Sequence, residues 1–184
     1  EWGWIPAVAC DSKDNVYVYS RSDHPLVVYN RQGNMLGVWG EGILEPKTAH
    51  GIFIDLNDNV YCTDASTHCV HKFDSEGKLV MTLGTPGRTG TKDGDPFNLA
   101  TDIDVASNGD IFVSDGYSNA AVHKFDPNGK HILSWGRSGT DPGEFNTVHN
   151  IAIDDDWVYI ADRENHRIQV FDSDGKYETQ WGNL

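Results

Sequence analysis

Short segments in which apolar and polar residues alternate recur along the whole chain. The alternation has the two-residue period of a β-strand, as in residues 16–19 (VYVY) and 111–114 (IFVS). The segments are rich in β-branched and aromatic residues, and Asn, Asp and Gly separate them, as at Asn108 and Gly109. We expect strands joined by tight turns and no amphipathic helix of any length.

The strand pattern repeats as a longer unit with a fixed turn sequence. Each copy contains Phe or Tyr, then Asp or Asn, then two variable residues and a glycine; these turn glycines stand 44, 52 and 46 residues apart. Units of this length with several strands each are typical of a β-propeller. The sequence therefore predicts an all-β propeller that forms one domain over residues 1–184. Its four repeats span about 6–40, 50–84, 101–136 and 149–182.

Composition limits the classes of partner. The chain has 184 residues, of which 38% are hydrophobic, and a formal net charge of −14. Such an acidic protein repels phosphate backbones, so nucleic acid is not an expected partner. No apolar run approaches the length of a membrane span, so no membrane partner is expected either. Cys62 and Cys69 flank a predicted hairpin, and we interpret them as small buried thiols rather than as a disulfide.

The repeats differ at the start of the first strand of each copy. Pro6, His50, Thr101 and His149 occupy this position, so the second and fourth copies carry histidine. First strands surround the channel of a propeller, and alternate blades of a six-bladed ring are about 120° apart, which suits a zinc ion with three histidine ligands and one open position. His50 and His149 would be two of those ligands. The alternative is that both are packed or hydrogen-bonded strand residues.

The turn after the second strand of each copy also varies. Arg21, Tyr117 and Arg163 lie in these turns, which we expect to meet at one end of the channel. Two guanidinium groups suit a substrate with a carboxylate, since arginine binds carboxylates through paired hydrogen bonds. A tyrosine beside a cation can act as a general base. Considered one at a time, each of these residues is more often a surface side chain.

Five segments carry a resemblance to one enzyme family, and the resemblance extends over essentially the whole chain. They are DSKDNVYVYSRSDH (11–24), AHGIFID (49–55), TDIDVASNGDIFVSDGYSN (101–119), FNTVHNIAID (145–154) and ADRENHRIQVF (161–171). The repeats resemble NHL repeats, and the series of blades resembles the catalytic domain of the peptidyl-α-hydroxyglycine α-amidating lyases. That resemblance implies a six-bladed propeller, of which about four blades are present, and a catalytic zinc held by three histidines.

The resemblance also implies a reaction and a set of site residues. Zinc would be held by His50 and His149, with the third histidine in a unit past Leu184. Tyr117 would be the catalytic base, and Arg163 and, by a looser match, Arg21 would hold the substrate carboxylate. The substrate would be a peptide ending in α-hydroxyglycine, and the products a peptide amide and glyoxylate. A calcium ion near the channel and a secreted or periplasmic location are further implications.

Some departures from the family leave other functions open. The cysteines that the lyases place beside the catalytic turns are absent, since Ser118 follows Tyr117 and Tyr159 precedes the turn of Arg163. The chain could be an inactive fragment of such an enzyme. It could also be a non-catalytic propeller that serves as a scaffold for a protein or ligand. Four blades of a six-bladed ring would leave two open flanks, and we expect the chain either to self-associate through them or to tighten into a smaller ring.

Overall fold

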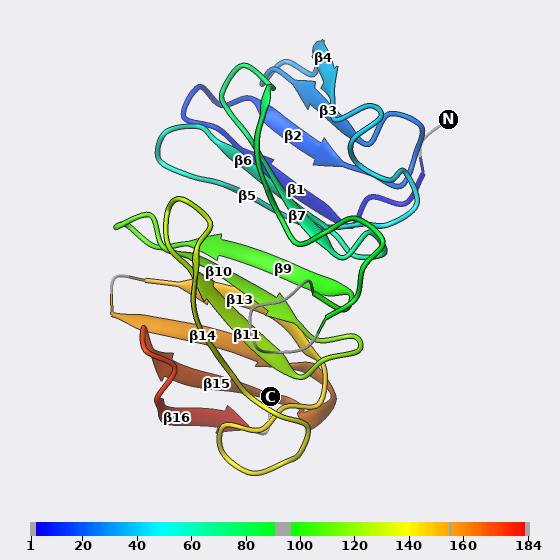
Figure 1. Cartoon of the computed structure of the whole chain (residues 1–184). Coiled ribbons are helices and arrows are strands. Elements are labelled where there is room, and N and C mark those ends of the chain that lie inside the picture. The colour runs from blue at the N-terminus through cyan, green and yellow to red at the C-terminus, as the bar shows by residue number, and fades with distance from the viewer. Residues whose placement is uncertain (1–2, 91–96, 155, 183–184) are drawn as a thin grey trace.

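Four antiparallel sheets of four strands each follow one another along the chain in the computed structural model, which describes residues 3–90, 97–154 and 156–182. Figure 1 shows the four blades in chain order from blue to red. The strands are β1 Ala7–Cys10, β2 Val16–Tyr19, β3 Leu26–Tyr29 and β4 Met35–Trp39 in the first sheet; β5 Ala49–Ile54, β6 Val60–Asp64, β7 Cys69–Phe73 and β8 Leu79–Leu83 in the second; β9 Ala100–Val105, β10 Ile111–Asp115, β11 Ala121–Phe125 and β12 His131–Trp135 in the third; and β13 Val148–Ile153, β14 Trp157–Asp162, β15 Arg167–Asp172 and β16 Tyr177–Gly182 in the fourth.

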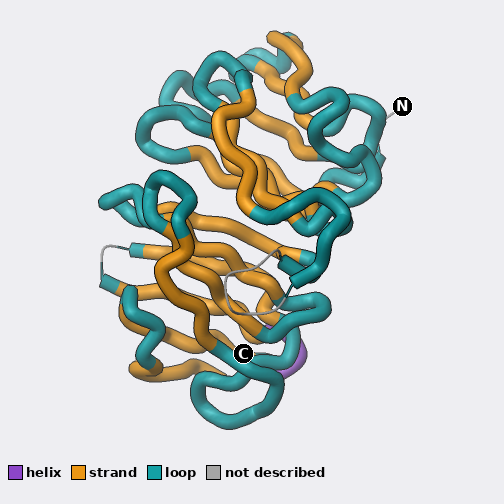
Figure 2. The backbone as a smooth tube through the Cα atoms, in the orientation of Figure 1, coloured by secondary structure: helices purple, strands orange, loops and turns teal. Residues whose placement is uncertain are grey.

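Each sheet is a simple meander in which every strand pairs with the next one in sequence. The first strands, β1, β5, β9 and β13, lie next to one another in succession and form the inner wall of the arc. This arrangement confirms the predicted all-β propeller. The sole helical segment among the described residues is a 3-10 turn at Arg163–Asn165, seen as the purple segment in Figure 2. None of the described residues forms a helix that is long and apolar enough to cross a membrane.

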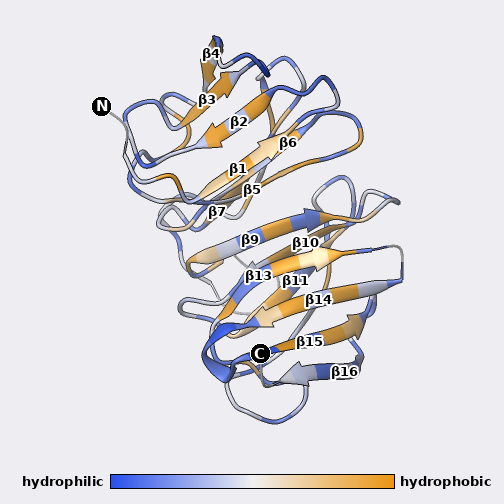
Figure 3. Ribbon diagram, turned by 180° about the vertical axis from the view of Figure 1, so that it is seen from behind, coloured by the Kyte–Doolittle hydropathy of each residue, from blue (hydrophilic) through white to orange (hydrophobic). Residues whose placement is uncertain are grey.

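The hydrophobic cores lie between blades rather than within them. One cluster joins the first and second sheets, a second joins the second and third, and a third joins the third and fourth. Tyr19, Phe97 and Phe171, one from each cluster, are almost completely buried. In Figure 3 the apolar residues accordingly concentrate along the strands, while the connecting loops are mostly polar. Burial of this apolar area is the main favourable term that holds successive blades together.

The tryptophans at the ends of the outer strands of the first and third blades also pack between blades. The indole of Trp39 lies over Gly77 of the second sheet, and the indole of Trp135 lies over Gly175 of the fourth. Both glycines have positive φ values, and a Cβ at either position would come within 2.6–2.7 Å of the ring. The turn glycine that defines the repeat therefore serves both the turn and the contact with the preceding blade.

In the second, third and fourth blades an aspartate ends the second strand and holds the segment leading into its own blade. The carboxylate of Asp64 accepts a hydrogen bond from the backbone N–H of Glu45 at 2.7 Å. Asp162 accepts one from the N–H of Asn146, also at 2.7 Å, and Asp115 is bonded in the same way to Asn98. All three aspartates are fully buried, which agrees with the structural role that their repetition suggests.

Two further features bear on the sequence-based expectations. Cys62 and Cys69 are buried free thiols, which confirms that interpretation over a disulfide. The outward faces of the first and last sheets expose large apolar side chains, with Val8 and Met35 61% and 62% exposed on the first and Trp181 50% exposed on the last. These faces are the two flanks at which we expect self-association.

Candidate functional site

The site lies where the first strands of the second, third and fourth sheets begin. The second residues of β5, β9 and β13 are His50, Thr101 and His149. The Thr101 hydroxyl donates to the carbonyl of Val148 at 2.8 Å, so at this position the third copy makes a contact with the next blade. The two histidine rings, in contrast, approach each other with centroids 5.2 Å apart.

The hydroxyl of Tyr117 lies between the two histidines. Its oxygen is 2.8 Å from Nε2 of His50 and 3.1 Å from Nε2 of His149. Tyr117 is in the turn after β10, and the residue is 41% exposed. The three residues come from three different parts of the chain, so their convergence depends on the packing of the second, third and fourth blades.

The environment of His50 favours the neutral imidazole. Burial, followed by the electrostatic influence of His149, Arg21 and Arg163, lowers the pKa of His50 to about 4. A hydrogen bond with the backbone of Thr101 acts in the opposite direction. At neutral pH the ring is therefore uncharged and one nitrogen carries a free lone pair, as metal coordination requires.

A chain of hydrogen bonds orients the ring of His149. Its Nδ1 lies 2.6 Å from the side-chain oxygen of Asn150, and the amide nitrogen of Asn150 donates to the carboxylate of Asp102 at 3.1 Å. Because the carboxylate of Asp102 can only accept from the amide NH2 group, the amide oxygen faces His149 and accepts the proton of Nδ1. The Nε2 atom of His149 is then unprotonated and faces the hydroxyl of Tyr117.

Asn150 and Asp102 were not among the residues predicted from the sequence. They follow directly after His149 and Thr101, and Gly51 holds the equivalent place after His50. A Cβ at position 51 would lie 2.3 Å from a carboxylate oxygen of Asp102 and 2.9 Å from its Cα. Glycine is thus the residue that allows Asp102 to pass close to β5. The Gly, Asp, Asn series at one repeat position was the signal that could have revealed them.

The two predicted arginines lie at the edge of this group. The guanidinium carbon of Arg163 is 5.6 Å from the centre of the Tyr117 ring, and its Nε donates to Glu164 at 2.8 Å. Nε of Arg21 donates to the carbonyl of Ala49 at 3.1 Å, directly before His50. Arg163 therefore contacts the tyrosine, whereas Arg21 is placed beside the first histidine by the backbone.

The side chains present suit part of a zinc site. Since both Nε2 atoms lie close to one hydroxyl oxygen, they face the same small space from different strands. Neutral imidazole nitrogens are ordinary zinc ligands, and a histidine whose other nitrogen is bonded to an amide or carboxylate is typical of such sites. Within the described residues no group of three or more His, Cys, Asp or Glu side chains converges to hold a metal ion. His50 and His149 thus form an incomplete donor set.

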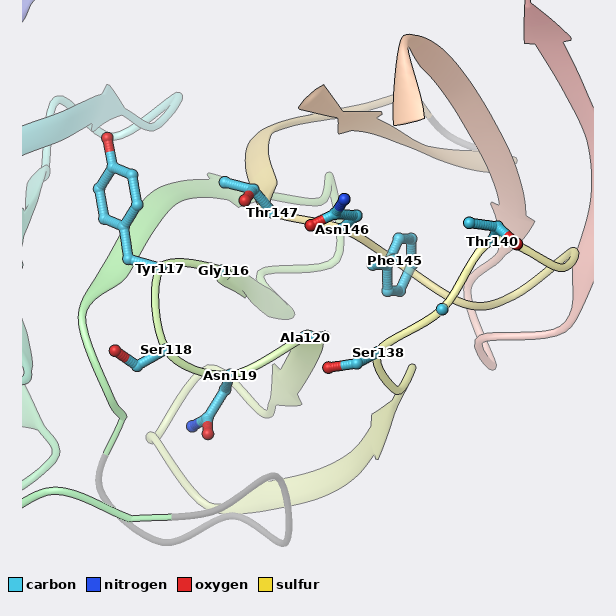
Figure 4. Close-up of a pocket in the computed structure, with 11 residues that line it drawn as sticks. Gly116, Tyr117, Ser118, Asn119, Ala120, Ser138, Thr140, Phe145, Asn146 and Thr147 are labelled. Atoms are coloured by element: carbon cyan, nitrogen blue, oxygen red, sulfur yellow. The ribbon is translucent and has the colours of Figure 1, made fainter. Parts of the chain in front are cut away.

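A cavity adjoins the site on the other side of the Tyr117 turn. Its volume is about 280 Å³, and the turn of residues 116–120 and the loop segments 138–140 and 145–147 line it. Figure 4 shows these residues around the cavity, with the phenol of Tyr117 directed away from it. The cavity and the histidines therefore lie on opposite sides of the Tyr117 backbone.

Comparisons with known proteins place the chain in a family. A family model described as a 6-bladed beta-propeller matches residues 90–181. The chain is 35% identical to peptidylglycine alpha-amidating monooxygenase of Rattus norvegicus over 95% of this chain and 21% of that protein. It is 34% identical to NHL repeat-containing protein 3 of Homo sapiens over 96% of this chain and 54% of that protein. It is 36% identical to a probable peptidyl-alpha-hydroxyglycine alpha-amidating lyase of Caenorhabditis elegans over 79% of this chain and 42% of that protein.

Solved structures support the same fold. A virginiamycin B lyase of Staphylococcus aureus, crystallised with quinupristin, superposes with a TM-score of 0.71 at 13% identity, over 97% of this chain and 55% of that one. At this identity the likeness concerns the fold alone. The chain spans about a fifth to about half of the length of the three relatives above. It belongs to the six-bladed β-propellers of the NHL-repeat type and is related to the peptidyl-α-hydroxyglycine α-amidating lyases and to NHL repeat-containing protein 3.

Proposed function

We propose that the chain carries part of the active site of a zinc-dependent lyase that acts on peptides ending in α-hydroxyglycine. The reaction cleaves the bond between the amide nitrogen and the hydroxyl-bearing carbon and gives a peptide amide and glyoxylate. The observation that carries the proposal is the Tyr117 hydroxyl at 2.8 Å and 3.1 Å from Nε2 of His50 and His149. Similarity to a probable lyase of this kind supports it.

Tyr117 is the group best positioned to move the proton. In its deprotonated form it accepts the proton of the substrate hydroxyl, whose carbon–oxygen bond then becomes the carbonyl of glyoxylate. The electron pair of the breaking carbon–nitrogen bond stays on the amide nitrogen, which takes up a proton to complete the peptide amide. The guanidinium carbon of Arg163 lies 5.6 Å from the centre of the tyrosine ring, so a positive charge stands beside the phenol that changes its protonation state.

The other residues bind and orient. Arg21 and Arg163 are the cations nearest to the histidines and would pair with the substrate carboxylate. His50 and His149 would hold the zinc ion together with a third ligand from outside this chain, and the bound ion would supply positive charge that favours ionisation of the substrate hydroxyl. The bond from Asn150 to His149 keeps the ring in the tautomer that coordination through Nε2 needs. A calcium ion near the channel stays a prediction.

The proposal is tested by zinc content and by glyoxylate release from α-hydroxyhippurate. We expect about one zinc per chain, or one per two chains if two chains share a site, when the protein is purified with zinc and measured by elemental mass spectrometry. His149→Ala should lose this zinc, while His131→Ala, on the outer strand β12, should keep it. Tyr117→Phe should keep zinc and lower glyoxylate release about 10²-fold or more. Zinc retention by His149→Ala, or full activity of Tyr117→Phe, would contradict the proposal.

A non-catalytic scaffold is the second candidate function. The relationship to NHL repeat-containing protein 3, whose name states only its repeats, favours it. This function predicts no specific zinc binding and no effect of Tyr117→Phe on the interactions of the protein. A secreted or periplasmic location is proposed for either function, and fractionation of the source cells tests it.

A further inference from the structure

The cavity beside the Tyr117 turn has an unusual lining for this acidic chain. The chain carries a net charge of −14, yet none of the eleven residues around the cavity is charged. The fully buried ring of Phe145 forms one apolar wall and is held by the ring of Phe171 at 5.7 Å. A charged group that entered would lose hydration without gaining a counter-charge, so the lining favours an uncharged occupant.

Several polar side chains of the lining have hydrogen-bonding capacity to offer. The side chains of Ser138, Thr140 and Asn146 make no hydrogen bond to any other described residue. Asn119, in contrast, is already used, since its amide donates to Asp115 at 2.7 Å. The two hydroxyls and the amide of Asn146 are therefore available to a ligand that can both donate and accept.

The cavity is structurally continuous with the candidate site. The carbonyl of Thr147 accepts a hydrogen bond from the N–H of Arg163 at 3.0 Å, and the carbonyl of Asn146 accepts one from the N–H of Glu164 at 2.9 Å. The same loop enters β13, where His149 lies two residues after Thr147. One wall of the cavity thus positions the arginine turn and a histidine, and Tyr117 forms another part of the wall.

We propose that this cavity is a peptide subsite that binds an uncharged polar side chain, such as that of glutamine, from one of the two residues preceding the C-terminal residue of the substrate. The proposal rests on the proposed function, which places the C-terminal residue of the peptide at the histidines and so sets the direction in which the peptide runs. Because the phenol of Tyr117 points away from the cavity, the cavity cannot take the reacting residue itself. An extended peptide advances about 3.3–3.6 Å per residue, so one or two residues carry it across the tyrosine turn. At about 280 Å³ the cavity is slightly below the usual size of a whole-ligand pocket and suits one side chain.

The test uses unreactive peptides and therefore does not depend on catalysis. Acetyl-X-Ala-Gly and acetyl-Ala-X-Gly, with X as Gln, Glu or Lys, are titrated against the ¹⁵N-labelled chain, and Kd is measured from chemical-shift changes. In one of the two series we expect the Gln peptide to bind about tenfold more tightly than the Glu and Lys peptides, with shifts in residues 116–120 and 138–147. Asn146→Asp should then make the Lys peptide bind about tenfold more tightly than the Glu peptide. Asn128→Asp makes the same change in an exposed turn of the third blade and should leave the order unchanged.

The possible outcomes distinguish failure of the subsite proposal from failure of the proposed lyase function. Equal binding of the three peptides, shifts confined to other residues, or an unchanged order in Asn146→Asp would overturn the subsite. Selective binding without glyoxylate release from α-hydroxyhippurate would support the subsite and contradict the lyase. Glyoxylate release without selective binding of the Gln peptide would support the lyase and contradict the subsite.

Discussion

Replacing Asp104 with asparagine should stabilise the protein at neutral pH. Asp104 lies on β9, and its carboxylate accepts a hydrogen bond from the backbone N–H of Ile153 on β13 at 2.8 Å. The pKa of Asp104 is raised to about 6, because burial and, to a smaller extent, the charge of Asp102 outweigh the opposite effect of two backbone hydrogen bonds. A carboxyl group with a raised pKa in the folded state binds protons more tightly when folded, so its ionisation disfavours folding.

The sign and size of the effect follow from the two pKa values. Stability contributed by this group is complete below the reference value of 3.8 and is lost as the pH rises to about 6. A shift of about two units corresponds to at most about 3 kcal/mol, and partial exposure of the side chain reduces this to about 1–2 kcal/mol. Asparagine keeps an oxygen that can accept from Ile153 but carries no charge. Asp104→Asn should therefore match the wild type near pH 4 and exceed its stability by about 1–2 kcal/mol at pH 7.

Urea unfolding at pH 4, 5, 6 and 7 measures this difference directly. The free energy of unfolding should separate steadily between pH 4 and pH 6, and the gap should be constant above pH 7. Asp23→Asn removes the same charge at an exposed position and should change stability little at any pH. A difference between Asp104→Asn and wild type that does not vary with pH, or a less stable variant at pH 7, would refute the reasoning.

Three further predictions concern the glycine beside Asp102, the tautomer of His149 and the exposed flanks. Gly51→Ala should destabilise the protein by about 1–3 kcal/mol in urea unfolding, because the new methyl group would overlap Asp102. Asn150→Ala should convert His149 from the Nδ1–H tautomer to a mixture rich in Nε2–H, which long-range ¹H–¹⁵N NMR spectra detect. The exposed apolar faces of the first and last sheets should cause concentration-dependent self-association, visible in sedimentation velocity, and a compact monomer at all concentrations would contradict this.

Most of the fold could be predicted because the length of the repeat and its turn pattern are typical of one architecture, the β-propeller. The period of the strands, the turn glycines and the repeated aspartates each describe a local requirement that every copy must meet, as Gly77 and Gly175 do under the indoles of the preceding blades. His50 and His149 could be singled out because they break the repeat at one position. The contact made by His68 is of another kind, because its Nδ1 accepts from the backbone N–H of Leu99 at 3.1 Å. The sequence could not predict this contact because the partner lies 31 residues away, in the segment leading to the next blade.

The residues that directly follow His50, Thr101 and His149 show why aligning the repeats is not sufficient to find the whole site. Gly51, Asp102 and Asn150 occupy one repeat position but differ completely in chemistry, so the alignment predicts no shared role for them. Across blades they depend on one another: Asp102 needs the space left by Gly51, and Asn150 needs the carboxylate of Asp102 to orient its amide toward His149. A propeller brings equivalent positions of successive blades into contact, so the choice at one position depends on its neighbour in the ring. The tautomer of a candidate ligand in the fourth blade is thus fixed by a carboxylate of the third, which fits only because the second blade has a glycine.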